Sequence, residues 1–223
     1  MTDDESTVRR LVRDHYADAA NDGCCSGTET ACCGDGDSGP DASSTDSPAD
    51  EIAREIGYDD EAIEIIEGEA NLGLGCGNPT AIADLEPGET VLDLGSGGGF
   101  DCLLAAREVG PEGRVIGVDM TPEMIEKARA NARENDAGNV SFRLGEIEHL
   151  PVADTTVDVI ISNCVVNLSP AKDRVFQEAY RVLQPGGRLA ITDPVRTDSL
   201  PECVRDDPGS LAGCISGAES PEA

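Results

Sequence analysis

The sequence predicts an α/β protein with a doubly wound, mainly parallel sheet, and two observations carry that prediction. From residue 89 onward, short apolar runs of strand length alternate with amphipathic stretches of helix length, as in repeated β-strand and α-helix units. The first apolar run leads into Gly95–Gly99 (GSGGG) and then into a helix. Because glycine has no side chain, such a turn lets the backbone approach a ligand closely at the end of a strand.

Each element has its own local signal. Apolar residues at helical spacing predict an amphipathic helix over residues 6–20 and a second helical stretch over 51–67. Strands are predicted at 90–94, 114–119, 140–144, 157–162 and 188–192, and crossover helices at 101–109, 122–135 and 172–183. Parallel strands need such crossovers, so five strands joined in this way form a doubly wound sheet.

The composition divides the chain into two regions. Residues 1–50 are predicted to form an N-terminal helix and a flexible linker, and residues 51–223 the main domain with a short C-terminal segment that holds Cys214. Between residues 23 and 50 the chain is rich in Gly, Ser, Thr, Asp and Pro and offers almost nothing to bury. Two vicinal cysteine pairs lie in this linker: Cys24, Cys25, Cys32 and Cys33.

The charge of the chain limits its partners. It has 16 basic and 45 acidic residues and a formal net charge of -29, which disfavours binding to nucleic acid or to an anionic membrane. The acids are spread along the whole chain and only two residues are lysine. At molar salt the Debye length falls to about 3 Å, so such a surface is tolerated. We expect a halophilic, cytoplasmic protein, with an acidic mesophilic one as the alternative; no secretory signal or membrane-spanning apolar run is found.

Nine cysteines need a chemical explanation. A reducing cytoplasm disfavours a disulfide framework, so metal, metalloid or redox thiols are the better interpretation. A zinc finger is not predicted, because no C-x-x-C pair or Cys/His set has the required spacing. Cys102, in the first crossover helix, is interpreted as a small buried apolar residue, and Cys203 as similar or spare.

A nucleoside-binding site is predicted at the glycine-rich turn. Asp119 ends the next strand, about 20 residues after the glycines, where a carboxylate accepts hydrogen bonds from ribose hydroxyls. A dinucleotide fingerprint would need glycine at position 100 or 102, which Phe100 and Cys102 occupy. Asp93, just before the turn, would repel a pyrophosphate but can pair with the cationic amino group of an amino acid. S-adenosylmethionine has both ribose hydroxyls and a cationic amino group, so it is the predicted cofactor.

The motif Val91–Gly99 (VLDLGSGGG) resembles the first motif of the class I methyltransferases, and the resemblance extends from about Glu89 to Pro194. It implies a Rossmann-like fold, a turn at Leu183–Arg188 into the fifth strand, and an acidic and an apolar residue beside the adenine after the third strand. The usual C-terminal antiparallel hairpin is not expected in the roughly 30 residues that follow. The predicted cofactor-binding residues are Asp93, Gly95, Ser96, Gly97, Gly99, Asp119, Met120, Glu146, Ile147 and Asn163.

Three cysteines lie where ligands bind in sheets of this kind. Cys76 precedes the first strand on a loop with glycines on both sides, Cys164 follows the fourth strand, and Cys214 follows the fifth. Since ligand sites lie outside the carboxyl ends of the strands, Cys164 is expected to face the reactive end of the cofactor. Soft metalloids such as As(III) bind thiolates, and three thiolates complete a pyramidal centre with a free lone pair.

The surroundings of these cysteines resemble those of the arsenite methyltransferases. The resemblance rests on Leu74–Pro79 (LGCGNP), Leu92–Cys102 (LDLGSGGGFDC), Ser162–Ser169 (SNCVVNLS) and Gly213–Ala218 (GCISGA). It implies that Cys76, Cys164 and Cys214 bind As(III), delivered as arsenite or its small-thiol conjugate, and that the arsenic is methylated for detoxification. The alternatives are a class I methyltransferase for another small molecule and a thiol protein that binds As(III) without turnover.

The same resemblance gives the linker cysteines a redox role. In this family, protein thiols supply the electrons that return arsenic to the trivalent state, and a thioredoxin-like partner reduces those thiols again. A thiolate of the linker could form a transient disulfide with Cys76, because a flexible tether keeps its effective concentration in the millimolar range. Nonspecific chelation of metal ions by the vicinal pairs is the alternative.

Overall fold

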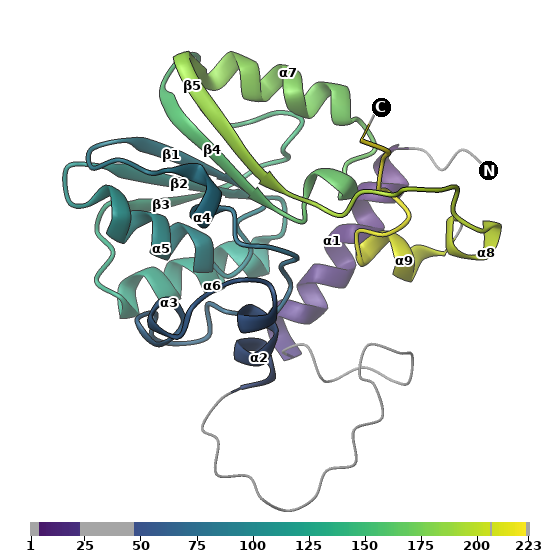
Figure 1. Ribbon diagram of the computed structural model, residues 1–223, viewed down its shortest axis with the longest axis horizontal. Coiled ribbons are helices and arrows are strands. Elements are labelled where there is room, and N and C mark those ends of the chain that lie inside the picture. The colour runs from purple at the N-terminus through teal and green to yellow at the C-terminus, as the bar shows by residue number, and fades with distance from the viewer. Residues whose placement is uncertain (1–4, 23–46, 206, 222–223) are drawn as a thin grey trace, which may run out of the picture.

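The computed structural model describes residues 5–22, 47–205 and 207–221 (Figure 1). Within these ranges, five strands form one sheet in the order β3-β2-β1-β4-β5, and every pair is parallel. The strands are β1 Thr90–Leu94, β2 Arg114–Asp119, β3 Val140–Leu144, β4 Val157–Asn163 and β5 Leu183–Thr192. The predicted doubly wound, Rossmann-like α/β fold is confirmed. The strand order reverses between β1 and β4, which is where such sheets bind ligands.

Helices cover both faces of the sheet. The helical elements are α1 Glu5–Asp22, α2 Pro48–Glu55, α3 Asp60–Glu64, α4 Thr80–Ala83, α5 Phe100–Val109, α6 Pro122–Glu134, η1 Val166–Leu168 (a 3-10 turn), α7 Lys172–Val182, α8 Glu202–Arg205 and α9 Pro208–Ala212. Helices α5 and α6 pack on one face and α7 on the other (Figure 1). Successive residues of β1 alternate between these cores: Val91 packs toward α5 and Leu92 toward α7, and both are completely buried. Burial on both faces explains why β1, β2 and β4 are mainly apolar.

Two predicted elements differ from the structure. The predicted helix over 51–67 is in fact two short helices, because Gly57 lies between α2 and α3 with φ +105° and the side chain of Asp59 caps α3. The predicted turn Leu183–Arg188 is part of β5, which begins at residue 183 and shifts register opposite Val157 and Val159. Gly186, at φ +91°, allows this irregularity within a strand. The linker with Cys24, Cys25, Cys32 and Cys33 lies outside the described residues.

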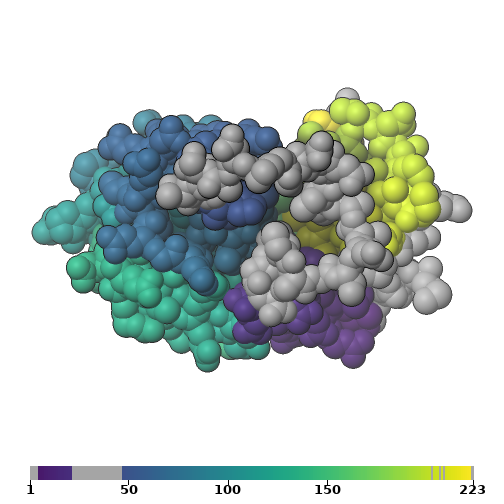
Figure 2. Space-filling view, turned by 90° about the horizontal axis from the view of Figure 1, so that it is seen from below, coloured from purple at the N-terminus to yellow at the C-terminus, as the bar shows by residue number. Residues whose placement is uncertain are grey.

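The first helix lies beside the C-terminal part of the described chain. Figures 1 and 2 show α1 next to α9 at one end of the molecule, and the Tyr16 hydroxyl donates a hydrogen bond to the carbonyl oxygen of Ala212 at 3.1 Å. Val12, also from α1, is buried in the same apolar cluster as Leu211. The two segments together close the end of the sheet at which β1 and β4 terminate. None of the helices in the described ranges is long and apolar enough to span a bilayer.

Candidate active site

A pocket opens at the carboxyl ends of β1 and β2 and is bounded by the glycine-rich turn. The predicted cofactor residues that line it are Asp93, Gly95, Ser96, Gly97, Asp119, Met120, Ile147 and Asn163. Gly99 and Glu146 are not among the residues that line it: Gly99 precedes α5 and faces Phe142, and the Glu146 side chain, 38% exposed, is paired with Arg9. The remaining walls include α1, the segment around Tyr58, the loop of residues 70–75 and the segment 165–170.

The glycine-rich turn is shaped by left-handed backbone angles. Gly95 and Gly97 have φ values of +66° and +48°, and a Cβ on Gly95 would overlap the side chain of Val165. The Gly97 amide donates to one carboxylate oxygen of Asp119 at 2.9 Å, and the Thr121 amide donates to the other at 2.8 Å. The ends of β1 and β2 are therefore joined, and Asp119 is held at the edge of the pocket.

Three carboxylates surround the inner part of this pocket, those of the buried Asp93 and of the half-buried Asp101 and Asp119. Burial raises the pKa of all three, and the neighbouring Asp101 raises the pKa of Asp93 further. None of them forms an ion pair with another side chain in the part of the chain that is described. The hydroxyl of Ser96 is also buried there and has no hydrogen-bond partner among the residues that the structure describes. These carboxylates and the Ser96 hydroxyl therefore fit a ligand with a cationic group and several hydroxyls, as S-adenosylmethionine has.

Asn163 connects this pocket to the loop that carries Cys76. Its amide nitrogen donates to the carbonyl oxygen of Gly77 at 2.8 Å and to the Tyr58 hydroxyl at 3.1 Å. Its side-chain oxygen accepts a hydrogen bond from the Cys76 backbone amide at 3.0 Å. A side chain at Gly75 would collide with Asn163, which explains why the loop needs glycine there. Asn163 thus lines the pocket and also positions Cys76.

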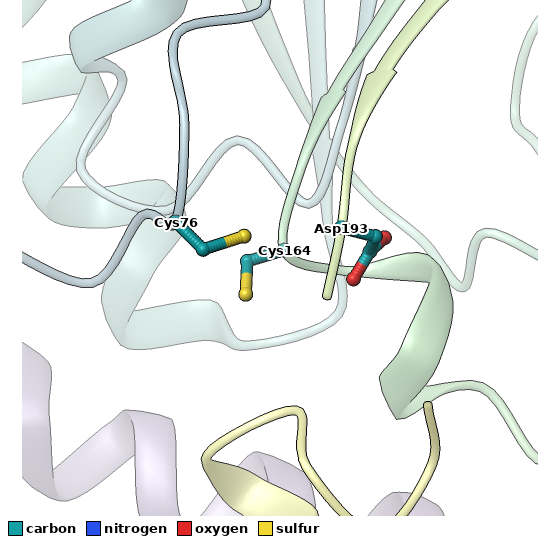
Figure 3. Close-up of side chains that lie close together, drawn as sticks. All are labelled: Cys76, Cys164 and Asp193. Atoms are coloured by element: carbon teal, nitrogen blue, oxygen red, sulfur yellow. The ribbon is translucent and has the colours of Figure 1, made fainter. Parts of the chain in front are cut away.

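The three predicted cysteines lie together although they come from distant parts of the chain. Cys76, Cys164 and Cys214 belong to one cluster with Val12 and Leu168. The Cys214 thiol donates to the carbonyl oxygen of Cys164 at 2.7 Å, and Cys164 also lines the cofactor pocket. Figure 3 shows the Cys76 side chain pointing toward Cys164. The thiol cluster therefore borders the pocket, with Cys164 belonging to both.

The cluster is held in a specific geometry. Cys164 and Cys214 both have φ +60°, an angle that non-glycine residues seldom adopt and that is common at functional sites. Hydrogen bonding with Cys164 and burial raise the pKa of the Cys76 thiol, and hydrogen bonding with Cys214 raises that of Cys164. A raised pKa favours the protonated form of the Cys76 and Cys164 thiols. A thiophilic ligand must therefore displace protons when it binds.

The C-terminal segment holds Cys214 firmly. Cys214 is 2% exposed, and the Asn167 side chain donates to the carbonyl oxygens of Pro194 at 2.7 Å and of Cys214 at 3.5 Å. Gly217 passes so close to the Asn167 backbone that any Cβ would overlap the Asn167 carbonyl oxygen. Cys214 is therefore buried and hydrogen-bonded within the site.

Tyr16 is a member of the cluster that the sequence does not single out. Its ring packs with Cys164 and Cys214 and lines the pocket. Burial raises its pKa, and the neighbouring Cys214 raises it further, so its hydroxyl remains a hydrogen-bond donor. Through the Ala212 carbonyl, this hydroxyl ties α1 to the turn that precedes Cys214.

Replacement of Tyr16 with phenylalanine is expected to loosen Cys214. The variant loses one part-buried hydrogen bond, which lowers the free energy of unfolding by about 1 kcal/mol, and the Cys214 thiol becomes more reactive toward an alkylating reagent. Reactivity is measured at each cysteine by mass spectrometry of digested protein. Tyr180→Phe is the matched control, since Tyr180 is 86% exposed on α7. Equal alkylation of Cys214 in both variants would show that Tyr16 does not hold this segment.

Asp193, just after β5, is a second residue that the sequence leaves unnoticed. Its Oδ2 accepts a hydrogen bond from the Val166 amide at 3.1 Å, while its Oδ1 is buried and has no partner among the described residues. One carboxylate oxygen of Asp193 and the sulfurs of Cys76 and Cys164 lie within 4.8 Å of one another (Figure 3). Burial raises the pKa of Asp193 to about 6.

The raised pKa of Asp193 predicts a pH-dependent effect of Asp193→Asn. Because the folded-state pKa of about 6 exceeds the ordinary value of 3.8, the native state binds the proton more tightly, and ionisation costs stability as pH rises through that window. The asparagine variant avoids this cost. Its stability relative to the unsubstituted chain should increase between about pH 4 and pH 6 and then stay constant. Urea unfolding at several pH values measures the difference; a difference independent of pH would contradict the assignment.

A buried ion pair fixes α1 over the mouth of the pocket. Glu148 is 3% exposed and accepts hydrogen bonds from Ser169 at 2.6 Å and from Arg9 at 3.3 Å. Both Arg9 and Glu148 line the pocket.

The remaining predicted cysteines also have defined places: Cys102 is fully buried, as expected, with its thiol 3.2 Å from an Asp93 carboxylate oxygen, and Cys203 is exposed.

Comparison with known proteins agrees with this architecture. The family model described as a methyltransferase domain matches residues 85–223. An arsenite methyltransferase of Halobacterium salinarum is 56% identical over 97% of this chain, and one of Aquipseudomonas alcaligenes is 46% identical over 65% of it. The crystal structure of an arsenic(III) S-adenosylmethionine methyltransferase from Chlamydomonas reinhardtii is 42% identical, with a TM-score of 0.60, over 77% of this chain and 58% of that one.

The chain spans about half the length of the curated relatives it matches, 55% of the Halobacterium protein and 43% of the Aquipseudomonas protein. The match to the family model nevertheless covers more than half of the present chain and includes all five strands of the described sheet. Fold, pocket and sequence comparison agree. The chain belongs to the methyltransferase domain family.

Proposed function

We propose that the protein methylates trivalent arsenic with S-adenosylmethionine, taking arsenite or its small-thiol conjugate as substrate. The observation that carries this proposal is the position of Cys164, which belongs to the thiol cluster and also lines the cofactor pocket. A metalloid held by the cluster would lie next to a cofactor in the pocket. The names of the similar proteins from Halobacterium and Aquipseudomonas support the same substrate.

The pocket residues have separate tasks in this proposal. Asp93, which is buried and forms no ion pair within the described residues, would pair with the amino group of the cofactor, and Asp119 would accept hydrogen bonds from its ribose. Ile147 is 8% exposed and part of the pocket wall, and it would pack against the adenine ring. When bound, S-adenosylmethionine supplies an activated methyl group on a sulfonium cation. Helix α1 and its Arg9–Glu148 ion pair exclude water from this side of the site.

The thiols bind and orient the substrate. Exchange of As(III) from a small-thiol conjugate onto Cys76, Cys164 and Cys214 forms three As–S bonds and breaks three, and each protein thiol proton passes to a departing thiol. The arsenic keeps its oxidation state and its lone pair. Good alignment of reacting groups can contribute about 7–11 kcal/mol, so positioning by the site is the main contribution that we assign to the chain.

We further propose that the protein serves arsenic detoxification in the cytoplasm and that a thioredoxin-like reductant restores its thiols. The linker cysteines Cys24, Cys25, Cys32 and Cys33 would deliver the electrons to Cys76, which is only half-buried and sits on a glycine-flanked loop. Replacing all four with serine tests this role. Multiple-turnover rates under limiting reductant should fall while single-turnover methylation is retained.

One assay tests the central proposal. The protein is incubated at high salt with arsenite, S-adenosylmethionine and a thiol reductant, and arsenic species are then separated and identified by mass spectrometry. Methylated arsenic is the expected product. Bound but unmethylated As(III) would instead identify a sequestering thiol protein, and failure to bind As(III) would point to another methyl acceptor.

A further inference from the structure

We propose that Cys76, Cys164 and Asp193 form a site for a thiophilic divalent cation such as Zn²⁺. In residues 5–22, 47–205 and 207–221 these side chains are the one group of three metal-ligating residues whose donor atoms lie within 4.8 Å of one another. Figure 3 shows them coming from three separate segments, the Cys76 loop, the end of β4 and the end of β5. Local spacing rules for zinc sites cannot detect such a set.

The size of the cluster suits a zinc ion after a small contraction. Zinc binds cysteine sulfur at about 2.3 Å and carboxylate oxygen at about 2.0–2.2 Å, so tetrahedral donors lie roughly 3.5–3.8 Å apart. With no donor pair more than 4.8 Å apart, closure needs movement of about 1 Å. Cys76 can supply this movement, because its loop has glycine on both sides and its thiol makes a long contact of 3.5 Å with the Thr192 carbonyl oxygen.

Asp193 supplies the independent observation that points to a cation. One of its oxygens is fixed by the Val166 amide, and the other is buried without any hydrogen-bond partner among the described residues. An unpartnered buried carboxylate oxygen is costly, and a bound cation would satisfy it. Three thiolates already complete the coordination of As(III), so arsenic does not need this oxygen. A mixed sulfur and oxygen set instead suits a borderline ion such as Zn²⁺.

Zinc binding exchanges two thiol protons for one metal ion. One Zn²⁺ forms bonds to two sulfurs and one carboxylate oxygen, the two thiol protons leave to solvent, and no atom changes its oxidation state. The fourth position is open to water or to the neighbouring Cys214. Because zinc and arsenic both need Cys76 and Cys164, they exclude each other. This competition rests on the proposed arsenic function, whereas zinc binding itself does not.

Direct binding tests the site without any methylation assay. The full chain with Cys24, Cys25, Cys32 and Cys33 replaced by serine is dialysed against Zn²⁺, and bound metal is quantified. We expect one tight zinc per chain, a loss of affinity of at least about a hundredfold in Cys164→Ser, and a loss of about tenfold or more in Asp193→Asn. Asp198→Asn, at an exposed position five residues further on, is the matched control. Unchanged affinity in Asp193→Asn would overturn the proposal.

X-ray absorption at the zinc edge of the unsubstituted site gives a second test that needs no variant. The expected shell contains sulfur at about 2.3 Å and at least one oxygen at about 2.0 Å; an all-sulfur shell would overturn the role of Asp193. In contrast, As(III) affinity of Asp193→Asn should stay within about threefold of the unsubstituted chain. If the arsenic assay fails while zinc binds as described, the proposed function fails and this inference stands.

Discussion

Cys164→Ser should abolish production of methylated arsenic while leaving the cofactor pocket intact. Cys164 is the cysteine shared by the thiol cluster and the pocket, so its loss removes the ligand nearest to the cofactor. Misplacement of a reacting atom by about 1 Å alone can cost a hundredfold in rate, and we expect at least that reduction. Arsenic speciation measures the rate, and equilibrium dialysis with labelled S-adenosylmethionine measures cofactor binding.

Cys203→Ser is the control for this substitution. Cys203 is exposed on α8 and lies outside the cluster, so its variant should methylate arsenic at the normal rate. If Cys164→Ser instead retains most of its methyltransferase activity, the acceptor is not bound by these thiols. That result would favour a methyltransferase acting on another small molecule.

Gly95→Ala should destabilise the fold and remove cofactor binding together. Gly95 has φ +66°, and a Cβ there would overlap Val165, whose backbone follows Cys164. Left-handed backbone costs a non-glycine residue about 1–2 kcal/mol, and overpacking adds about 1–3 kcal/mol. We expect a loss of about 2–5 kcal/mol in the free energy of unfolding and at least tenfold weaker binding of S-adenosylmethionine. Urea unfolding and isothermal titration measure the two effects.

Gly88→Ala separates backbone strain from steric overlap. Gly88 also has a positive φ, +91°, but a Cβ there meets nothing within 4 Å. This variant should lose only about 1–2 kcal/mol and bind the cofactor normally. Equal effects at Gly95 and Gly88 would show that the contact with Val165 has no influence on the site.

The elements predicted best were those specified by their own residues. The bounds of β1, β2 and β3 agree with the prediction because each is a short apolar run with a clear break at both ends. The glycine-rich turn and Asp119 were recognised for the same reason, since a motif and a fixed spacing describe them. Gly57 shows the limit of this approach: one left-handed residue divides a stretch that is helical by apolar spacing alone.

The residues that were missed act through contacts between distant segments. Tyr16 meets Ala212 across 196 positions in the sequence, and Asp193 comes near Cys164 because β4 and β5 are neighbours in the sheet. Neither belongs to a local motif. Periodicity and spacing describe local stretches of sequence, so they could not have identified either residue.

Arsenic bonded to two of the clustered thiols would crosslink segments that lie far apart in the sequence. Cys164 and Cys214 are separated by 50 residues, and a metalloid bonded to both sulfurs would close that length of chain into a loop. A covalent bridge of this span removes about 4 kcal/mol of unfolded-state entropy in the usual chain model. Arsenic would thus act as a reversible crosslink that raises the free energy of unfolding of the arsenic-bound protein. Release of the methylated product would return this free energy to its value without arsenic.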